Sequence, residues 1–119
     1  MRKIDNMTGK QFEKLLIDLF TKQNYSVKKT KTGKEQGADF ILYTGYSSIA
    51  VQAKRWNKKV GNKAVQEIYS AKTYYNCDSA WVITNNYFTK PAKDLAKKCN
   101  VELFDRNGLS EIIHRATYY

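Results

Sequence analysis

Three polar side chains interrupt two neighbouring apolar segments of this sequence. Asp39 lies near the start of residues 38–43, and Gln52 and Lys54 lie near the end of residues 48–54. A carboxylate and an amide oxygen are hard donors that suit Mg²⁺. An ammonium group can stabilise negative charge on a phosphoryl group and can help to orient or deprotonate an attacking water. Together the three groups could hold a divalent ion and a phosphate, which hydrolysis of a phosphodiester requires.

The connection between the two segments decides whether these groups meet. Gly45 and Tyr46 suit a two-residue hairpin loop, with glycine in the first position of a type II′ turn. Such a loop places Asp39 opposite Gln52, and the alternation of side chains puts Lys54 on the same side of the sheet. A loop longer or shorter by one residue would move Asp39 to the other face. The sequence therefore predicts convergence of the three groups, conditional on this register.

The other elements follow from apolar periodicity and from helix caps. Thr8 and Gln11 form the pattern of a capping box, and Thr89 is placed to cap a later helix. The expected helices cover about residues 8–23, 62–75, 89–99 and 109–115, and the expected strands cover residues 25–29, 38–43, 48–54, 80–84 and 101–104, with a polar loop at residues 30–37. This order, αβββαβαβα, predicts an α/β fold with one central mixed β-sheet flanked by helices.

Composition narrows the class of partner. Lys and Arg outnumber Asp and Glu by 21 to 11, which gives a formal net charge of +10. This balance favours a polyanion such as nucleic acid, although a lysine-rich surface also keeps a small protein soluble. One histidine and two isolated cysteines exclude a zinc site with four Cys or His ligands.

The length and hydropathy of the chain set further expectations. Its 119 residues suit a single domain, residues 1–119. No apolar run is long enough to span a membrane, and the N-terminus lacks the apolar core of a signal peptide. We therefore expect a cytoplasmic protein without a membrane partner.

The segment after Lys54 is basic and carries an indole. Arg55, Lys58 and Lys59 surround Trp56 in the sequence. Cations bind phosphates, and an indole can stack on a base or a sugar. The alternative for Trp56 is packing on the helix expected at residues 62–75. We expect the three cations to contact DNA and leave both roles of Trp56 open.

The motifs around these residues resemble the Mrr-like restriction endonuclease branch of the PD-(D/E)XK nuclease superfamily. The run GADFI at residues 37–41, followed by VQAKR at residues 51–55, matches the variant in which glutamine replaces the acid of the ExK motif. The resemblance begins at residues 8–9, continues through residues 60–67 and ends near residues 108–109. It therefore covers nearly the whole chain.

This resemblance implies a restriction-endonuclease-like core that cuts DNA with Mg²⁺, with Mn²⁺ able to substitute. It implies that Asp39 and Gln52 are metal ligands and that Lys54 is the catalytic lysine. Glu13 matches a first-helix acid that completes the metal site, and its alternative is a solvated helix charge. Gln66 matches a helix residue that steadies the site, and we expect it also to contact DNA.

Three functions remain open from the sequence. The first is an endonuclease that restricts foreign or modified duplex DNA, and the second is a branched-DNA (Holliday junction) resolvase with the same core. The third is a basic DNA-binding module that has lost turnover, since glutamine stands in place of an acid. Cutting of both strands by a domain with one site generally requires two symmetric copies, so we expect a homodimer.

Overall fold

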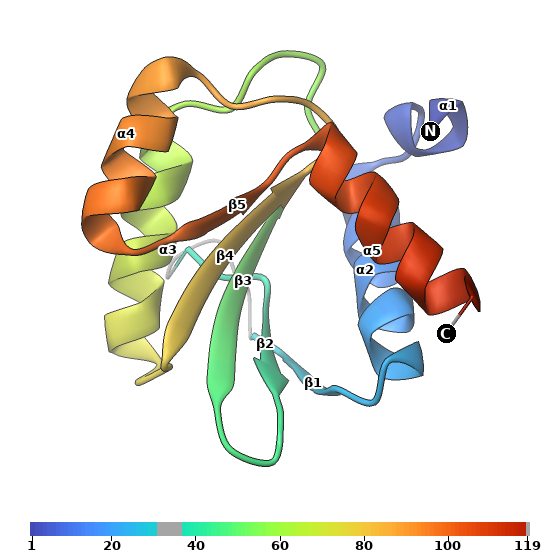
Figure 1. Ribbon diagram of the computed structural model, residues 1–119, viewed down its shortest axis with the longest axis horizontal. Coiled ribbons are helices and arrows are strands. Elements are labelled where there is room, and N and C mark those ends of the chain that lie inside the picture. Colours follow the sequence, from blue (N-terminus) through green and yellow to red (C-terminus); the bar gives the residue numbers. More distant parts are fainter. Residues whose placement is uncertain (31–36, 119) are drawn as a thin grey trace.

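The computed structural model describes residues 1–30 and 37–118 and contains a five-stranded sheet (Figure 1). The strands lie across the sheet in sequence order: β1 (Ser26–Lys29), β2 (Phe40–Tyr43), β3 (Ser48–Lys54), β4 (Ser79–Thr84) and β5 (Glu102–Phe104). The β1–β2 and β2–β3 pairs are antiparallel, whereas the β3–β4 and β4–β5 pairs are parallel. The predicted central mixed sheet is therefore confirmed.

Helices cover both faces of this sheet. Helices α2 (Gly9–Lys22) and α5 (Arg106–Tyr118) pack together on one face, and α3 (Asn62–Tyr74) and α4 (Lys90–Cys99) pack on the other (Figure 1). Helices α3 and α4 are also the crossover connections of the two parallel strand pairs. A short helix that the sequence analysis missed, α1 (Arg2–Asp5), precedes α2. Its four residues are too few to show a helical period.

Side-chain alternation in β2 and β3 creates a core on each face. Phe40 and Val51 are fully buried in the cluster that includes α2 and α5 residues. Ile41 and Ala50 are buried in the cluster formed with α3 and α4. By the same alternation, Gln52 lies on the α3 side of β3. Gln52 therefore shares a face of the sheet with Ile41 and Ala50, and Phe40 and Val51 occupy the opposite face.

The register of the hairpin is as predicted up to Phe40, which pairs with Val51. The expected opposition of Asp39 and Gln52 is not observed as a ladder pair. The N–H of Asp39 donates to the carbonyl of Val51 at 2.8 Å, so Asp39 and Phe40 both oppose Val51. This two-against-one pattern is that of a β-bulge, which re-aims the side chain of the extra residue.

The prediction of a type II′ turn at Gly45 is wrong. Gly45 does not adopt a positive φ. The hydroxyl of Thr44 instead accepts hydrogen bonds from the N–H groups of Tyr46 and Ser47, at 3.1 and 2.9 Å. Hydrogen bonding by a threonine side chain thus supports the loop without the backbone freedom of glycine.

The predicted helix caps are present. Thr8 and Gln11 form the reciprocal hydrogen bonds of a capping box, and the hydroxyl of Thr89 accepts from the N–H of Ala92 at 3.2 Å. At the other end of α2, Asn24 lies one residue beyond the C-cap Gln23 and has a left-handed φ of 70°. These caps account for the close agreement between predicted and observed helix starts.

The segment before β2 approaches α3 directly. The predicted polar loop lies largely outside the described residues, which resume at Gly37. Gly37 has a φ of +79°, and a Cβ there would lie 2.4 Å from the backbone oxygen of Glu67. Only glycine avoids both the strain and the clash. Its lack of a side chain therefore lets the chain leading to Asp39 rest against the α3 backbone.

Two further expectations concern membranes and cysteines. Across residues 1–30 and 37–118, no helix has the length and apolar character needed to cross a membrane. Cys77 is buried, Cys99 is partly buried, and both are free thiols.

We expect Gly37→Ala to destabilise the protein by about 2–3 kcal/mol, because it combines a strained φ with a clash against a backbone carbonyl. Urea unfolding followed by circular dichroism measures this loss. Gly45→Ala is the matched control, since a Cβ at Gly45 meets nothing within 4 Å. Similar losses in the two variants would contradict this account of Gly37.

Candidate active site

The structure gathers Asp39, Gln52 and Lys54 where β2 begins and β3 ends. One oxygen of Asp39, Oδ2, accepts a hydrogen bond from the N–H of Ala53 at 2.7 Å. The positive charge of Lys54 acts on the carboxyl group of Asp39, and the Lys54 side chain is 24% exposed. The predicted carboxylate, amide and ammonium therefore occupy one region that solvent reaches.

The amide of Gln52 is buried and oriented. Its Nε2 donates to the carbonyl of Gly37 at 2.9 Å and lies 3.2 Å from Oε1 of Glu67. Because both partners accept hydrogen bonds, they determine which end of the amide carries the nitrogen. The other end, Oε1, is buried and has no hydrogen-bond partner among the described residues. Leaving such an oxygen unpaired costs about 1–3 kcal/mol, and a cation would satisfy it.

Glu67 is a site residue that the sequence analysis missed. Its Oε1 lies 3.9 Å from Nζ of Lys54, in addition to its contact with Gln52. Gln66, the helix residue that the sequence analysis expected to steady the site, is exposed. Helical spacing would have distinguished the two, because Glu67 is three residues after the buried Ala64 and four before the buried Ala71. Glu67 therefore borders the buried face of α3.

Glu13 approaches the site from α2. Its side chain is 20% exposed, and its carboxylate lies 3.5 Å from Nζ of Lys29. The negative charge of Glu13 also acts on the carboxyl group of Asp39. Glu13 is therefore a partly buried neighbour of the site rather than a freely solvated helix charge.

Burial raises the pKa of Asp39 to about 6. The hydrogen bond from the N–H of Ala53 and the charge of Lys54 lower the pKa, whereas the charges of Glu13 and Glu67 raise it. At neutral pH the site therefore holds an ionised carboxylate in surroundings that disfavour it. A divalent cation beside Asp39 would relieve that penalty.

The described side chains include no cluster of three or more His, Cys, Asp or Glu that could hold a metal ion. A metal site among these residues would therefore need the amide oxygen of Gln52 or water in addition to carboxylates. The unpartnered oxygen of Gln52 meets that requirement, so the donor set fits a hard divalent cation.

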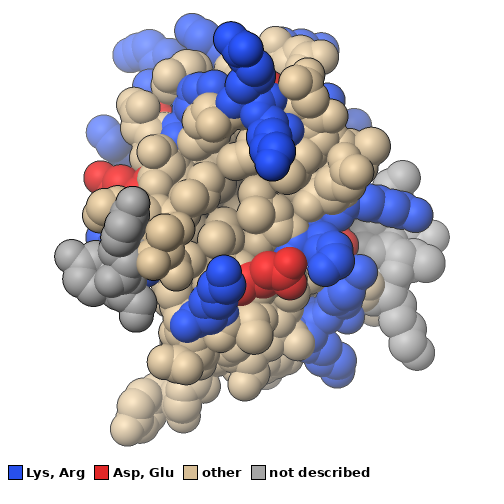
Figure 2. Space-filling view, turned by 90° about the vertical axis from the view of Figure 1, so that its right-hand side faces the viewer, with Lys and Arg blue, Asp and Glu red and all other residues tan. Residues whose placement is uncertain are grey.

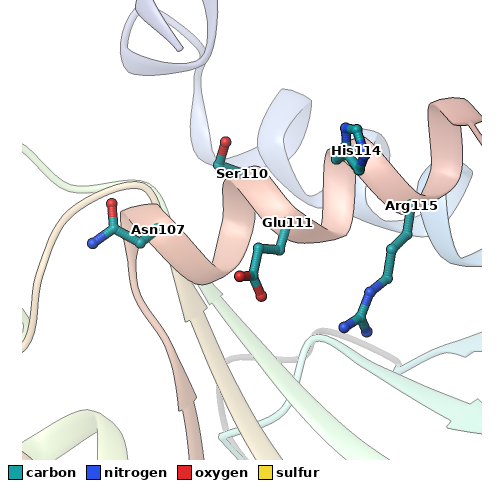
Figure 3. Close-up of a pocket in the computed structure, with 5 residues that line it drawn as sticks. All are labelled: Asn107, Ser110, Glu111, His114 and Arg115. Carbon is teal, nitrogen blue, oxygen red and sulfur yellow. The ribbon is translucent and has the colours of Figure 1, made fainter.

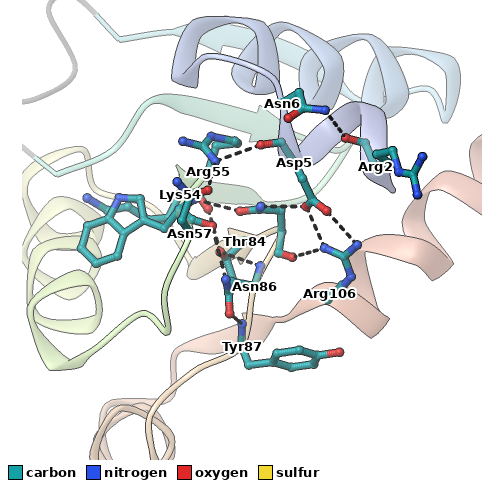
Figure 4. A network of polar contacts seen from close by, with 12 residues as sticks. Arg2, Asp5, Asn6, Lys54, Arg55, Asn57, Thr84, Asn86, Tyr87 and Arg106 are labelled. Atoms are coloured by element: carbon teal, nitrogen blue, oxygen red, sulfur yellow. Dashed lines mark hydrogen bonds and ion pairs between the residues drawn. The ribbon is translucent and has the colours of Figure 1, made fainter.

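A polar network holds the backbone just after Lys54 (Figure 4). The buried side chain of Asn85 accepts from the N–H of Trp56 at 2.8 Å and donates to Oδ1 of Asp5 at 3.1 Å. Two nitrogens of Arg106 in turn contact the two carboxylate oxygens of Asp5, at 2.7 and 3.0 Å. Hydrogen bonds from Arg106 and Asn85 lower the pKa of Asp5 to about 2. Helices α1 and α5 are thus tied to the end of β3.

Arg55 belongs to the same network. Its Nη1 donates to the backbone oxygen of Asp5 at 3.1 Å and to Oδ1 of Asn57 at 2.7 Å. Its Nε is buried without a hydrogen-bond partner in the described part of the chain. These contacts give Arg55 a structural role, and its expected contact with DNA stays a prediction.

Lys58 and Lys59 are exposed beside the site, as a DNA contact requires. Trp56 packs partly buried against the core under α3 and α4, which supports the packing role that the sequence left open. The amino groups of Lys54 and Lys58 lie 5.2 and 5.4 Å from the centre of its ring. These distances permit cation–π contacts, so Trp56 helps to place both cations.

Basic side chains also border the opposite helix layer. On the face that carries α2 and α5, Lys and Arg outnumber Asp and Glu around a broad uncharged surface (Figure 2). A surface hollow lies along α5, between Asn107 and Arg115, and its labelled side chains all come from that one helix (Figure 3). It contains none of the residues that converge at β3, so we assign no chemistry to it.

The chain is similar to known proteins both in sequence and in fold. A family model described as a restriction endonuclease, that of the Mrr catalytic domain, matches residues 4–113. A solved structure titled "Crystal Structure of Protein of Unknown Function AF1548" has a TM-score of 0.72, with 16% identity over 88% of this chain. The chain spans 65% of that protein's length, and at this identity the likeness shows the fold alone. No curated protein matches the chain.

We expect Asp39→Asn to raise Tm by about 4 °C or more at pH 7.5 in metal-free buffer. The folded-state pKa of Asp39 is about 6 and its ordinary value is 3.8, so the folded state is penalised when this carboxyl ionises. The gain should shrink as the pH falls from about 6 towards 4, because Asp39 in the folded wild type then becomes neutral.

Calorimetry at both ends of this pH range measures the effect. Asp18→Asn is the control, since the side chain of Asp18 is 58% exposed in α2 and its pairing with Lys14 is weak. A gain in Tm that is the same at pH 4 and pH 7.5 would contradict the role of ionisation.

Proposed function

Because this chain belongs to the Mrr catalytic-domain family of restriction endonucleases, we propose that it is a metal-dependent endonuclease acting on duplex DNA. The observation that carries this proposal is the buried oxygen of Gln52, which lacks a hydrogen-bond partner among the described residues and lies in the same site as Asp39 and Lys54. Residues 1–119 would act as one catalytic domain.

Asp39 and Gln52 would hold Mg²⁺, with Mn²⁺ able to substitute. Glu13 would complete the site, directly or through a water. When bound, the divalent ion supplies positive charge to the phosphate and makes a water more acidic. The support for this assignment is the hard oxygen set and the raised pKa of Asp39, because each is relieved by a divalent cation.

Lys54 would stabilise the transition state. As a water oxygen attacks phosphorus, the bond from phosphorus to the leaving oxygen breaks, and negative charge grows on the phosphoryl oxygens. An ammonium at the rim of the site offsets that charge and can orient the attacking water. The contacts of Lys54 with Glu67 and with the Trp56 ring keep its side chain at this rim.

DNA would approach over the exposed lysines that follow β3. Lys58 and Lys59 add cations beside the site, and the chain as a whole carries a net charge of +10. We propose foreign or modified duplex DNA as the substrate and a homodimer as the active form, since cutting both strands generally requires two symmetric sites.

The decisive experiment incubates purified protein with plasmid, methylated and unmethylated duplexes, and a four-way junction. Cleavage with Mg²⁺ or Mn²⁺ that chelation, Asp39→Ala and Lys54→Ala each abolish would support the nuclease. Preference for the four-way junction would instead favour a resolvase. Binding of DNA without cleavage, whichever metal ion is added, would instead support a DNA-binding module that has lost turnover.

We expect Lys54→Ala to reduce the cleavage rate at least about 100-fold and to change DNA affinity less than about 3-fold. The reason is that the charge of Lys54 is needed chiefly as negative charge develops in the transition state. Single-turnover cleavage and metal-free fluorescence anisotropy separate the two effects. The control is Lys98→Ala, an exposed lysine of α4, which should alter neither. Equal losses of rate and affinity in Lys54→Ala would contradict this role.

We expect the double variant Lys58→Ala, Lys59→Ala to bind every DNA sequence more weakly. Each phosphate contact that is lost should reduce the slope of log affinity against log salt by about 0.9. Titrations between low and moderate salt measure the slope. A slope equal to that of the wild type would remove these two lysines from the DNA surface.

A further inference from the structure

Helix α3 places the carboxylate of Glu67 beside the amide of Gln52, whose Oε1 has no hydrogen-bond partner among the described residues. Glu67 is the one acidic residue of α3, and its side chain is 34% exposed. Its Oε1 lies 3.2 Å from Nε2 of Gln52 and 3.9 Å from Nζ of Lys54. A single carboxylate oxygen therefore contacts two of the three residues to which we assign the chemistry.

The contact between Glu67 and Gln52 fixes the orientation of the Gln52 amide. An amide nitrogen has two hydrogens, and Nε2 of Gln52 has two acceptors, the carbonyl of Gly37 and the carboxylate of Glu67. Rotation of the amide by 180° would turn its oxygen against both acceptors, which repel it. Together the two acceptors therefore keep Oε1 of Gln52 turned away from them, at the place where it lacks a partner among the described residues.

The backbone of Glu67 is placed independently of this hydrogen bond. Gly37 sits so close to it that an added Cβ would lie 2.4 Å from the Glu67 carbonyl oxygen and 2.8 Å from its carbonyl carbon. The same glycine supplies the other acceptor for Gln52. The packing of residue 37 on α3 thus brings both acceptors to the amide at once.

Direct binding of DNA does not account for this carboxylate. Glu67 lines a small hollow together with the cations Lys54 and Lys63. A negative charge there repels phosphate, so it weakens nucleic-acid binding. Its value to the site must come from the protein groups that it contacts.

We propose that Glu67 is a positioning residue that orients the Gln52 amide so that Oε1 faces a bound divalent ion. This inference rests on the proposed function, because it assumes that the site binds such an ion. Partners that orient a metal ligand typically change metal affinity or activity by about 10–100-fold when removed.

The test is a titration of the protein with Mn²⁺ in the absence of DNA. The electron paramagnetic resonance signal of free Mn²⁺ measures how much of the ion is bound. Glu67→Ala should weaken Mn²⁺ binding about 10-fold. Glu67→Gln should stay within about 3-fold of the wild type, because its amide oxygen can still accept from Gln52. The matched control is Glu102→Gln, which removes an exposed carboxylate where β5 begins and should leave Mn²⁺ affinity unchanged.

A double-variant cycle separates positioning from direct ligation. If Glu67 acts through Gln52, adding Glu67→Ala to Gln52→Ala should cause little further loss of Mn²⁺ affinity. Metal-free DNA affinity should be unchanged or tighter in Glu67→Ala, since a repelling charge is removed. Unfolding curves of each variant confirm that folded proteins are being compared.

Three results would overturn the inference. Wild-type Mn²⁺ affinity in Glu67→Ala would show that the contact does not orient the amide. Equal losses in Glu67→Gln and Glu67→Ala, additive with Gln52→Ala, would make Glu67 a metal ligand itself. Absence of Mn²⁺ binding and of cleavage in the wild type would remove the proposed function as well, and this result is distinguishable because it appears before any substitution.

Discussion

The hydrogen-bonded ladder between β2 and β3, and the point at which it becomes irregular, determine the candidate site. Phe40 and Val51 are buried in the core beneath α2 and α5, and a one-residue slip would turn the side chains of the slipped strand towards the opposite core beneath α3 and α4, which resists the slip. Strand β3 is also paired in parallel with β4, where Gln52 lies opposite Val82, so Gln52 remains in a ladder beyond the last β2–β3 pair. The bulge at Asp39 then turns one carboxylate out of the regular pleat, so that its oxygen reaches the N–H of Ala53.

Much of this arrangement was predictable because it depends on local patterns. Helical period, capping residues and apolar alternation are short-range signals, and they indicated the five strands and the four longer helices. The strand register also followed from the loop length, although the turn itself differed. The hydroxyl of Thr44 replaced the glycine conformation expected at Gly45, and both solutions join the strands in the same register.

The features that could not be predicted depend on contacts between distant residues. Nothing near Asp39 in the sequence indicates a bulge, which the structure reveals through the bond from the N–H of Asp39 to the carbonyl of Val51. The bond from Arg55 to the backbone oxygen of Asp5 joins residues 50 positions apart, so the sequence around Arg55 does not indicate it. The choice between Gln66 and Glu67 is the exception, because the helical spacing of Glu67 from Ala64 and Ala71 would have favoured it. Sequence reasoning thus predicted the convergence of Asp39, Gln52 and Lys54 more reliably than the contacts that hold these residues in place.

The ion pair between Asp5 and Arg106 joins residues 101 positions apart in the chain. Synthesis must therefore have passed Arg106 before this ion pair can form. Because Asn85 links Asp5 to the N–H of Trp56, the backbone beside Lys54 depends on this pair through one intermediate side chain. A nascent chain that has not yet reached Arg106 would consequently hold Lys54 on a strand end that lacks this support.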